Sequence, residues 1–213
     1  MDTMAGAYLE RTPWTELRLA AVRDLVDPHP DDRVLDLGCA AGAITHYVST
    51  FGADAVGIDF EPLAIERARA LFPGLHFEVA DATSLPFPEG SFDKAVAADF
   101  VEHIDDEMFL RMCGELRRVL VPRGTFALYT PNPRHLIERL KAHDVLLAQN
   151  PTHIGLREAA QLEALLQEAG FTVVRSEWRP SFFPGLRLVE RLAGRKLDLF
   201  RYRLCILARS REL

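Results

Sequence analysis

The feature that most constrains the fold is a repeated alternation between short apolar segments and longer segments with helical periodicity. The short segments are apolar enough for strands of a parallel sheet that is covered on both sides. The longer segments run for about 10–15 residues, as helices of βαβ units do. We expect strands at residues 33–37, 55–59, 75–79, 93–98, 125–130, 171–178 and 203–209, and helices at 14–26, 43–51, 62–71, 105–120 and 158–169. This order predicts an α/β fold with a seven-stranded, mostly parallel sheet and helices on both faces.

Length and charge fit a single domain that spans residues 1–213. A chain of this size can bury a full core without disulfides or structural metal ions. Its net charge of -6 argues against nucleic acid as a partner, because nucleic-acid sites are usually strongly basic. The three cysteines are far apart and form no CxxC motif, so we expect reduced thiols in a cytoplasmic protein. We expect neither a signal peptide nor a membrane span, since no long apolar run is present.

The turn after the first expected strand gives the strongest indication of a binding site. It reads DLGCAAG from Asp36 to Gly42, and its glycines and small residues let a ligand approach the backbone closely. The GxxxG spacing differs from the GxGxxG of dinucleotide-binding proteins, and the Asp36 carboxylate would repel a pyrophosphate. Asp59, at the end of the second expected strand, is placed to accept hydrogen bonds from ribose hydroxyls. These residues predict a nucleoside ligand with a cationic tail and no pyrophosphate.

Several segments resemble, in the right order, the motifs of class I S-adenosylmethionine-dependent methyltransferases, including methyltransferase type 11 and the ubiquinone-biosynthesis O-methyltransferases. The segments are VLDLGCAAG (34–42), GIDF (57–60), VADATSLPFPEGSFD (79–93), AADFVEHIDD (97–106), ELRRVLVPRGTFALYTPNP (115–133) and HIGLREAAQLEALLQEAGF (153–171). The resemblance implies a Rossmann-like methyltransferase fold with an antiparallel last strand. It also implies S-adenosylmethionine as cofactor and S-adenosylhomocysteine as product.

The same resemblance implies which residues bind the cofactor. Asp59 would bind the ribose, Asp81 the adenine amino group, and the backbone of Ala82 an adenine nitrogen. The family usually has glycine where this chain has Ala40, and an alanine strains the loop if a positive φ is required there. The full expected set is Asp36, Gly38, Cys39, Ala40, Gly42, Asp59, Phe60, Asp81, Ala82, Asp99 and Phe100.

Four of these residues also have a purely structural interpretation. Asp36 could satisfy N–H groups of its own loop, Asp59 could cap the following helix, and Asp81 could form an Asx turn. Phe60 could belong to the core instead of lying against the adenine ring.

Two histidines are the candidate catalytic residues. His103 ends the group Asp99-Phe-Val-Glu102-His103 after the fourth strand, and an imidazole can act as a general base near neutral pH. His153 lies in the segment after the fifth strand, where we expect contact with the acceptor or proton transfer. Alternatively, Glu102 and His103 only start a helix and shape the pocket floor. A third interpretation is a divalent metal held by Asp99, Glu102, His103 and His153, as in the similar metal-assisted O-methyltransferases, but the sequence favours a site without a metal.

Two further segments are expected around the pocket. Residues 1–30 would form an N-terminal helical cap and residues 131–156 a lid over the acceptor, with His135 and His143 on a surface helix and without a role. The predicted function is methyl transfer to an O or N atom of a small molecule by a monomer or homodimer. The alternatives are a metal-assisted RNA 2′-O-methyltransferase and a non-catalytic cofactor-binding module. A dinucleotide-dependent oxidoreductase is disfavoured by the missing GxGxxG motif.

Overall fold

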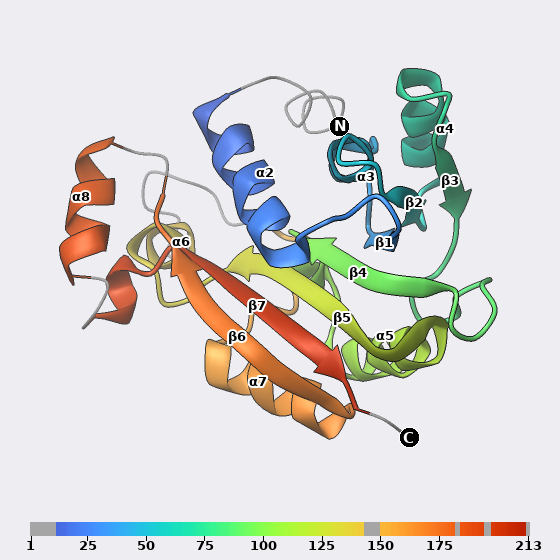
Figure 1. Cartoon of the computed structure of the whole chain (residues 1–213). Helices are drawn as coiled ribbons and strands as arrows, with labels where there is room; N and C mark the ends of the chain where they lie inside the picture. Colours follow the sequence, from blue (N-terminus) through green and yellow to red (C-terminus); the bar gives the residue numbers. More distant parts are fainter. Residues whose placement is uncertain (1–11, 143–149, 182–183, 194–196, 212–213) are drawn as a thin grey trace.

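The computed structural model describes residues 12–142, 150–181, 184–193 and 197–211. Its centre is a seven-stranded sheet with the strand order β3-β2-β1-β4-β5-β7-β6 (Figure 1). The strands are β1 (Arg33–Leu37), β2 (Asp54–Asp59), β3 (His76–Val79), β4 (Phe92–Ala98), β5 (Leu120–Pro131), β6 (Phe171–Arg179) and β7 (Arg203–Ser210). β7 runs antiparallel to both of its neighbours, and the remaining neighbours pair in parallel. The predicted α/β fold with an antiparallel last strand is therefore confirmed.

Helices cover both faces of this sheet. The helices are α2 (Pro13–Val26), α3 (Ala43–Ser49), α4 (Pro62–Leu71), α5 (Asp106–Val119), α6 (Leu136–Ala142), α7 (Ala159–Glu168) and α8 (Pro184–Ala193), with the short 3₁₀-helices η1 (Val101–His103) and η2 (Asp198–Phe200). α2 and α3 pack on one face, whereas α5 and α7 pack on the other (Figure 1). None of the described helices combines the length and apolarity needed to cross a bilayer.

The central strands are buried on both sides because successive side chains point to opposite faces. In β5, Phe126 and Leu128 join the core under α5 and α7, whereas Ala127 and Tyr129 join the core under α2 and α3. This arrangement explains why the strand segments are apolar throughout, and it leaves their carboxyl ends as the free edge for a site.

The boundary between α5 and β5 differs from the sequence prediction. The expected helix ends at residue 120 and the expected strand begins at residue 125, with Pro122 and Gly124 between them, but β5 begins at Leu120, directly after α5. The register with β4 shifts there: Phe92 pairs with Leu120, and pairing resumes with Lys94 and Thr125. A proline, which has no N–H to donate, is tolerated at such an irregularity.

Candidate functional site

A cavity of about 630 Å³ lies at the carboxyl ends of β1, β2 and β4. Its wall contains nearly all of the residues predicted to bind the cofactor, together with the candidate base. They are Asp36, Gly38, Cys39, Ala40, Asp59, Phe60, Asp81, Ala82, Asp99, Phe100 and His103. The predicted residues Gly42 and His153 do not line the cavity, although Thr152, the neighbour of His153, does.

The loop between β1 and α3 has a left-handed backbone at three positions. Gly38, Ala40 and Gly42 have φ angles of 68°, 48° and 83°. A Cβ on Gly38 would lie 2.4 Å from Cδ2 of Phe100, so only glycine leaves room for that ring. A Cβ on Gly42 would lie 2.6 Å from Cζ of Phe77, so this glycine serves the packing of the loop against β3. The positive φ that would strain an alanine is present at Ala40, at a cost of about 1–2 kcal/mol.

Asp36 is buried at the base of this loop. The Thr45 hydroxyl on α3 donates a hydrogen bond of 2.7 Å to Oδ2 of Asp36. Burial raises the pKa of Asp36 to about 7, against the opposing effects of the Thr45 hydrogen bond and of Arg18. A positively charged group in the cavity would therefore favour the ionised form of this carboxyl group.

Asp59 connects β2 to the loop. Its Oδ2 accepts a hydrogen bond of 2.9 Å from the N–H of Ala40, and its Oδ1 accepts one of 3.0 Å from the N–H of Glu61. The N-cap of α4 is Glu61, whose side chain accepts from the N–H of Leu63. The interpretation of Asp59 as the helix cap is therefore wrong. Each carboxylate oxygen has capacity for a further donor on the cavity side.

Phe60 and Asp81 line the same part of the cavity. Phe60 is 74% exposed, so the interpretation of Phe60 as a core residue is wrong. Oδ1 of Asp81 accepts hydrogen bonds from the N–H and the hydroxyl of Thr83, at 2.7 and 2.8 Å. The Asx turn is thus present, and it holds the Asp81 carboxylate at the cavity wall.

Asp99 forms two ion pairs beneath the cavity. Nε of Arg18 lies 2.7 Å from Oδ2, and Nη1 of Arg203 lies 3.0 Å from Oδ1. Arg18 also donates a hydrogen bond of 2.9 Å to the carbonyl of Ala98, and all three charged side chains are at most 10% exposed. Because both carboxylate oxygens are engaged by arginines, Asp99 is not available as the metal ligand considered from the sequence.

Arg18 is a lining residue that the sequence interpretation missed. It lies on α2, four residues after Trp14 and three before Ala21. Both of those positions belong to the apolar periodicity of the helix, so the spacing already puts Arg18 on the buried face. A charged residue on such a face needs a partner, and that is the signal that could have revealed it.

Glu102 and two histidines form a cluster beside the ion pairs. One ligand atom from each of Glu102, His103 and His153 lies within 4.8 Å of the other two. The hydroxyl of Thr130 donates a hydrogen bond of 3.0 Å to buried Glu102, and burial, together with the charge of Asp99, raises the pKa of Glu102 to about 8. A glutamic acid that keeps its proton at neutral pH is a poor cation ligand. Burial and the neighbouring His103 lower the pKa of His153.

The contacts of His103 define its tautomer. Its Nδ1 lies 2.9 Å from Oγ1 and 3.2 Å from the carbonyl oxygen of Thr152. The Thr152 hydroxyl donates its own proton to Asn150, at 2.9 Å, and a carbonyl oxygen can only accept. Nδ1 of His103 therefore carries the proton, which leaves Nε2 with a free lone pair.

Arg157 fixes the segment that contains His103. This arginine is 4% exposed, and its guanidinium donates to the carbonyls of Val101, Ile104 and Gly155 at 2.7–2.9 Å. It also pairs with Asp106 at 2.7 Å. Through these contacts η1 and residues 150–155 are held as one unit at the cavity edge.

The expectation for His135 is wrong. Its side chain is fully buried, and its Nε2 lies 3.0 Å from Oε1 of Glu190 on α8. Oε2 of Glu190 accepts a hydrogen bond of 2.6 Å from the N–H of Ser181. His135 therefore anchors α8 instead of lying on a surface helix. His143 falls outside the described residues.

Comparison with known proteins identifies the family. The family profile of a methyltransferase domain matches residues 34–124. An uncharacterised methyltransferase of Synechocystis sp. is 34% identical over 149 residues, which cover 68% of this chain and 69% of the relative. A probable S-adenosylmethionine-dependent methyltransferase of Mycolicibacterium smegmatis is 31% identical over 66% of this chain and 52% of its own length. The chloroplastic tocopherol O-methyltransferase of Arabidopsis thaliana is 34% identical over 56% and 36%, respectively. The chain thus spans about half of the length of the curated relatives it matches.

Solved structures agree on the fold. An S-adenosylmethionine-dependent methyltransferase of Methanosarcina mazei superposes with a TM-score of 0.68 at 24% identity, over 90% of this chain and 97% of that one. The sheet order, the loop after β1 and these relatives lead to one conclusion. The chain belongs to the class I, Rossmann-like S-adenosylmethionine-dependent methyltransferases.

Proposed function

We propose that this chain transfers a methyl group from S-adenosylmethionine to an O or N atom of a small molecule. The observation that carries the proposal is the cavity at the strand ends, which is lined by Asp36, Asp59, Asp81 and His103. The relative that methylates tocopherol supports a small acceptor. The net charge of -6 argues against nucleic acid.

The residues that line the cavity match the successive parts of S-adenosylmethionine. Asp59 has an open acceptor position on each oxygen for a ribose hydroxyl, and Asp81 would accept from the adenine amino group, next to the backbone of Ala82. Phe60, exposed at the cavity edge, would cover the adenine face. Gly38 and its neighbours Cys39 and Ala40 let the ligand approach the backbone.

The charges near the loop suit the amino-acid end of the donor. Asp36 would face the ammonium and sulfonium charges, and Arg18 would place positive charge near the carboxylate. Asp99 holds Arg18 in place through its ion pair, and Phe100 packs against Gly38. When bound, S-adenosylmethionine supplies a methyl group on a good leaving group, so alignment can contribute about 7–11 kcal/mol at best.

A base is needed only if the acceptor must lose a proton, as a hydroxyl does. Nε2 of His103 would accept that proton, since the contact of Nδ1 with Thr152 fixes the tautomer. His153 packs edge-on against His103 with ring centroids 4.9 Å apart, so we propose that it orients His103.

The surrounding segments complete the proposed arrangement. The predicted lid at residues 131–156 would close over the acceptor and exclude water, and the predicted cap at residues 1–30 would cover another side of the cavity. Residues 143–149 of the lid and 1–11 of the cap lie outside the described residues. We place the enzyme in the cytoplasm, as a monomer or homodimer, in keeping with its three buried free cysteines.

The first test is calorimetry with S-adenosylmethionine and S-adenosylhomocysteine. We expect micromolar binding that Asp59→Ala abolishes. Asp54→Ala is the matched control, because Asp54 is the exposed first residue of the same strand, at the end away from the cavity. A wild-type protein that binds neither compound would refute the proposal. Binding without turnover of any acceptor would favour a non-catalytic module.

A metal-assisted reaction is the second candidate, on the observation that Glu102, His103 and His153 gather within 4.8 Å. It predicts that EDTA abolishes turnover and that Mn²⁺ or Mg²⁺ restores it. If turnover is unchanged in EDTA, His103 acts without a metal.

A further inference from the structure

Helix α8 buries its one acidic side chain and turns its apolar side toward solvent. Glu190 is 4% exposed and is held by His135 and Ser181. On the other side, Leu188, Val189 and Leu192 are 63%, 42% and 73% exposed. At 100° per residue these three positions fall within one sector of the helix.

This arrangement is the reverse of an ordinary surface helix, which buries its apolar stripe. Single exposed apolar side chains are common and need no explanation. A continuous apolar helix face indicates a partner, and Leu197, just after α8, is also 53% exposed. The buried contacts of Glu190 attach α8 through polar groups, and within the described part of the chain its apolar face stays exposed.

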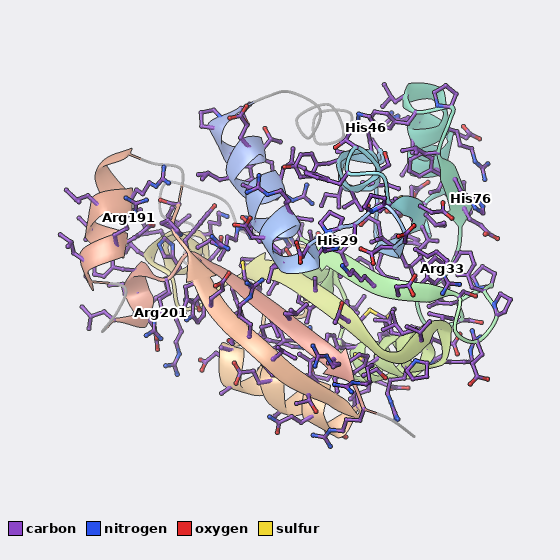
Figure 2. The ribbon with its side chains drawn as sticks, in the orientation of Figure 1. His29, Arg33, His46, His76, Arg191 and Arg201 are labelled. Carbon is purple, nitrogen blue, oxygen red and sulfur yellow. The ribbon has the colours of Figure 1, made fainter. Side chains whose placement is uncertain are left out.

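The charges beside this face are positive. Arg187 and Arg191 lie on α8 beside the apolar face. The one acidic residue within α8, Glu190, is buried. Figure 2 shows Arg191 and Arg201 at the same end of the molecule. The exposed charges of α8 are therefore positive, although the net charge of the chain is -6.

A cleft of about 430 Å³ lies beside α8, and buried Glu190 is one of its lining residues. Its lining includes Trp178, Arg191 and Arg201, and the Arg201 guanidinium lies 5.6 Å from the Trp178 ring centroid. Arg201 is also paired with Asp198 at 2.6 Å. An indole beside guanidinium groups suits the boundary between phosphate headgroups and acyl chains.

We propose that α8 docks on an anionic lipid surface. Leu188, Val189 and Leu192 would enter the outer part of the acyl layer, while Arg187 and Arg191 would contact the phosphates. A second copy of the chain fits less well. A two-fold contact puts the same patch on both sides, so the arginines of one α8 would face those of the other without an exposed acidic partner on that helix. The inference is independent of the reaction at the cavity.

The test is co-sedimentation of the full chain with phosphatidylcholine vesicles that do or do not contain phosphatidylglycerol. We expect binding only to the anionic vesicles, weakened by salt. Leu188→Ser/Leu192→Ser should reduce the partition coefficient about tenfold or more. Leu63→Ser/Leu71→Ser is the matched control, because both leucines are exposed on α4, at 54% and 48%, far along the sheet from α8. Equal loss in both double variants would overturn the proposal.

A second readout does not depend on removing the apolar face. Cys39, Cys113 and Cys205 are buried, so a cysteine introduced as Leu192→Cys can be labelled selectively with a polarity-sensitive dye. We expect a blue shift on anionic vesicles, and none for the dye on Leu71→Cys. Absence of the shift overturns the proposal. So does light scattering that shows a dimer which Leu188→Ser/Leu192→Ser converts to monomer, because the occupant would then be a second copy.

Discussion

The backbone N–H of Ala40 donates a hydrogen bond of 2.9 Å to Oδ2 of Asp59. Ala40 makes this bond with a φ of 48°, a conformation that suits glycine better than alanine. The loop conformation and the orientation of the Asp59 carboxylate are therefore coupled, so a change of backbone conformation at Ala40 also affects how Asp59 is oriented.

Replacing Ala40 with glycine should relieve that strain. Ala40→Gly is expected to stabilise the chain by about 0.5–1 kcal/mol, or about 1–4 °C in Tm, less than the full cost of the strain because glycine gains entropy when unfolded. Thermal unfolding measures the change. The neighbouring Ala41 has no positive φ, so Ala41→Gly should destabilise instead. Equal destabilisation by both variants would show that Ala40 is unstrained.

Gly38→Ala should have the opposite effect. Its Cβ would lie 2.4 Å from the Phe100 ring, at a position with φ of 68°, so we expect a loss of about 1–3 kcal/mol and weaker cofactor binding. Chemical denaturation and calorimetry measure the two effects. Phe100→Ala in the same chain should recover part of the stability. Gly114→Ala is the control: no atom lies within 4 Å of its added Cβ inside α5, and it should stabilise the chain by about 1 kcal/mol.

Removing Asp99 should be costly. Asp99→Ala leaves Arg18 and Arg203 buried without their shared counter-ion, and we expect a loss of about 3–5 kcal/mol in the free energy of unfolding. Urea denaturation is the measurement. Glu158→Ala removes an exposed pair with Arg134 and should cost at most about 1 kcal/mol. Similar losses in the two variants would mean that the buried ion pairs contribute no more than a surface pair.

Glu102 should make stability depend on pH. Its pKa is raised from the usual 4.5 to about 8, so the folded state keeps a proton that the unfolded state has released. This contribution to stability is complete below pH 4.5 and is lost as the pH rises through about 8. Glu102→Gln removes the ionisation, so its Tm relative to wild type should rise between pH 6 and 9, by about 2–4 °C per kcal/mol. A constant difference in Tm over that range would contradict the raised pKa.

His103 should affect turnover more than cofactor binding. With a hydroxyl acceptor, His103→Ala is expected to lower kcat by about 10²–10⁴-fold, with a much smaller change in the Kd of S-adenosylmethionine. Thr152→Val, which removes the hydroxyl but keeps the carbonyl partner of Nδ1, should lower kcat less. If His103→Ala leaves kcat unchanged, His103 is not the base and only shapes the floor of the pocket.

The sequence predicted the parts of the site that are local. Asp36, Gly38 and Asp59 lie at strand ends, and strand ends can be identified from apolar runs. The contacts of Ala40 and Asp81 depend only on the backbone conformation of the turns that contain them. The same local rules placed the start of β5 wrongly, because Pro122 was left outside the strand although β5 tolerates it at a register shift.

The missed features depend on pairs that are distant in the chain. His135 is buried with its Nε2 hydrogen-bonded to Glu190, which is 55 residues away in the chain. Asp99 is engaged by Arg18 and Arg203, which belong to the first and last described elements. The periodicity of one segment cannot identify a partner in a distant segment. Each of these polar or charged side chains, considered by itself, is of a type that is usually exposed.

The position of β7 has a consequence for the order in which the protein can mature. This last described strand lies between β5 and β6, and it delivers Arg203 to Asp99. A nascent chain that has emerged from the ribosome only as far as β6 has an open edge at β5 and holds Asp99 with one arginine instead of two. The floor of the cavity is therefore completed only when β7 has been synthesised and has paired with β5 and β6, so a nascent chain has its complete ligand site only from that point on.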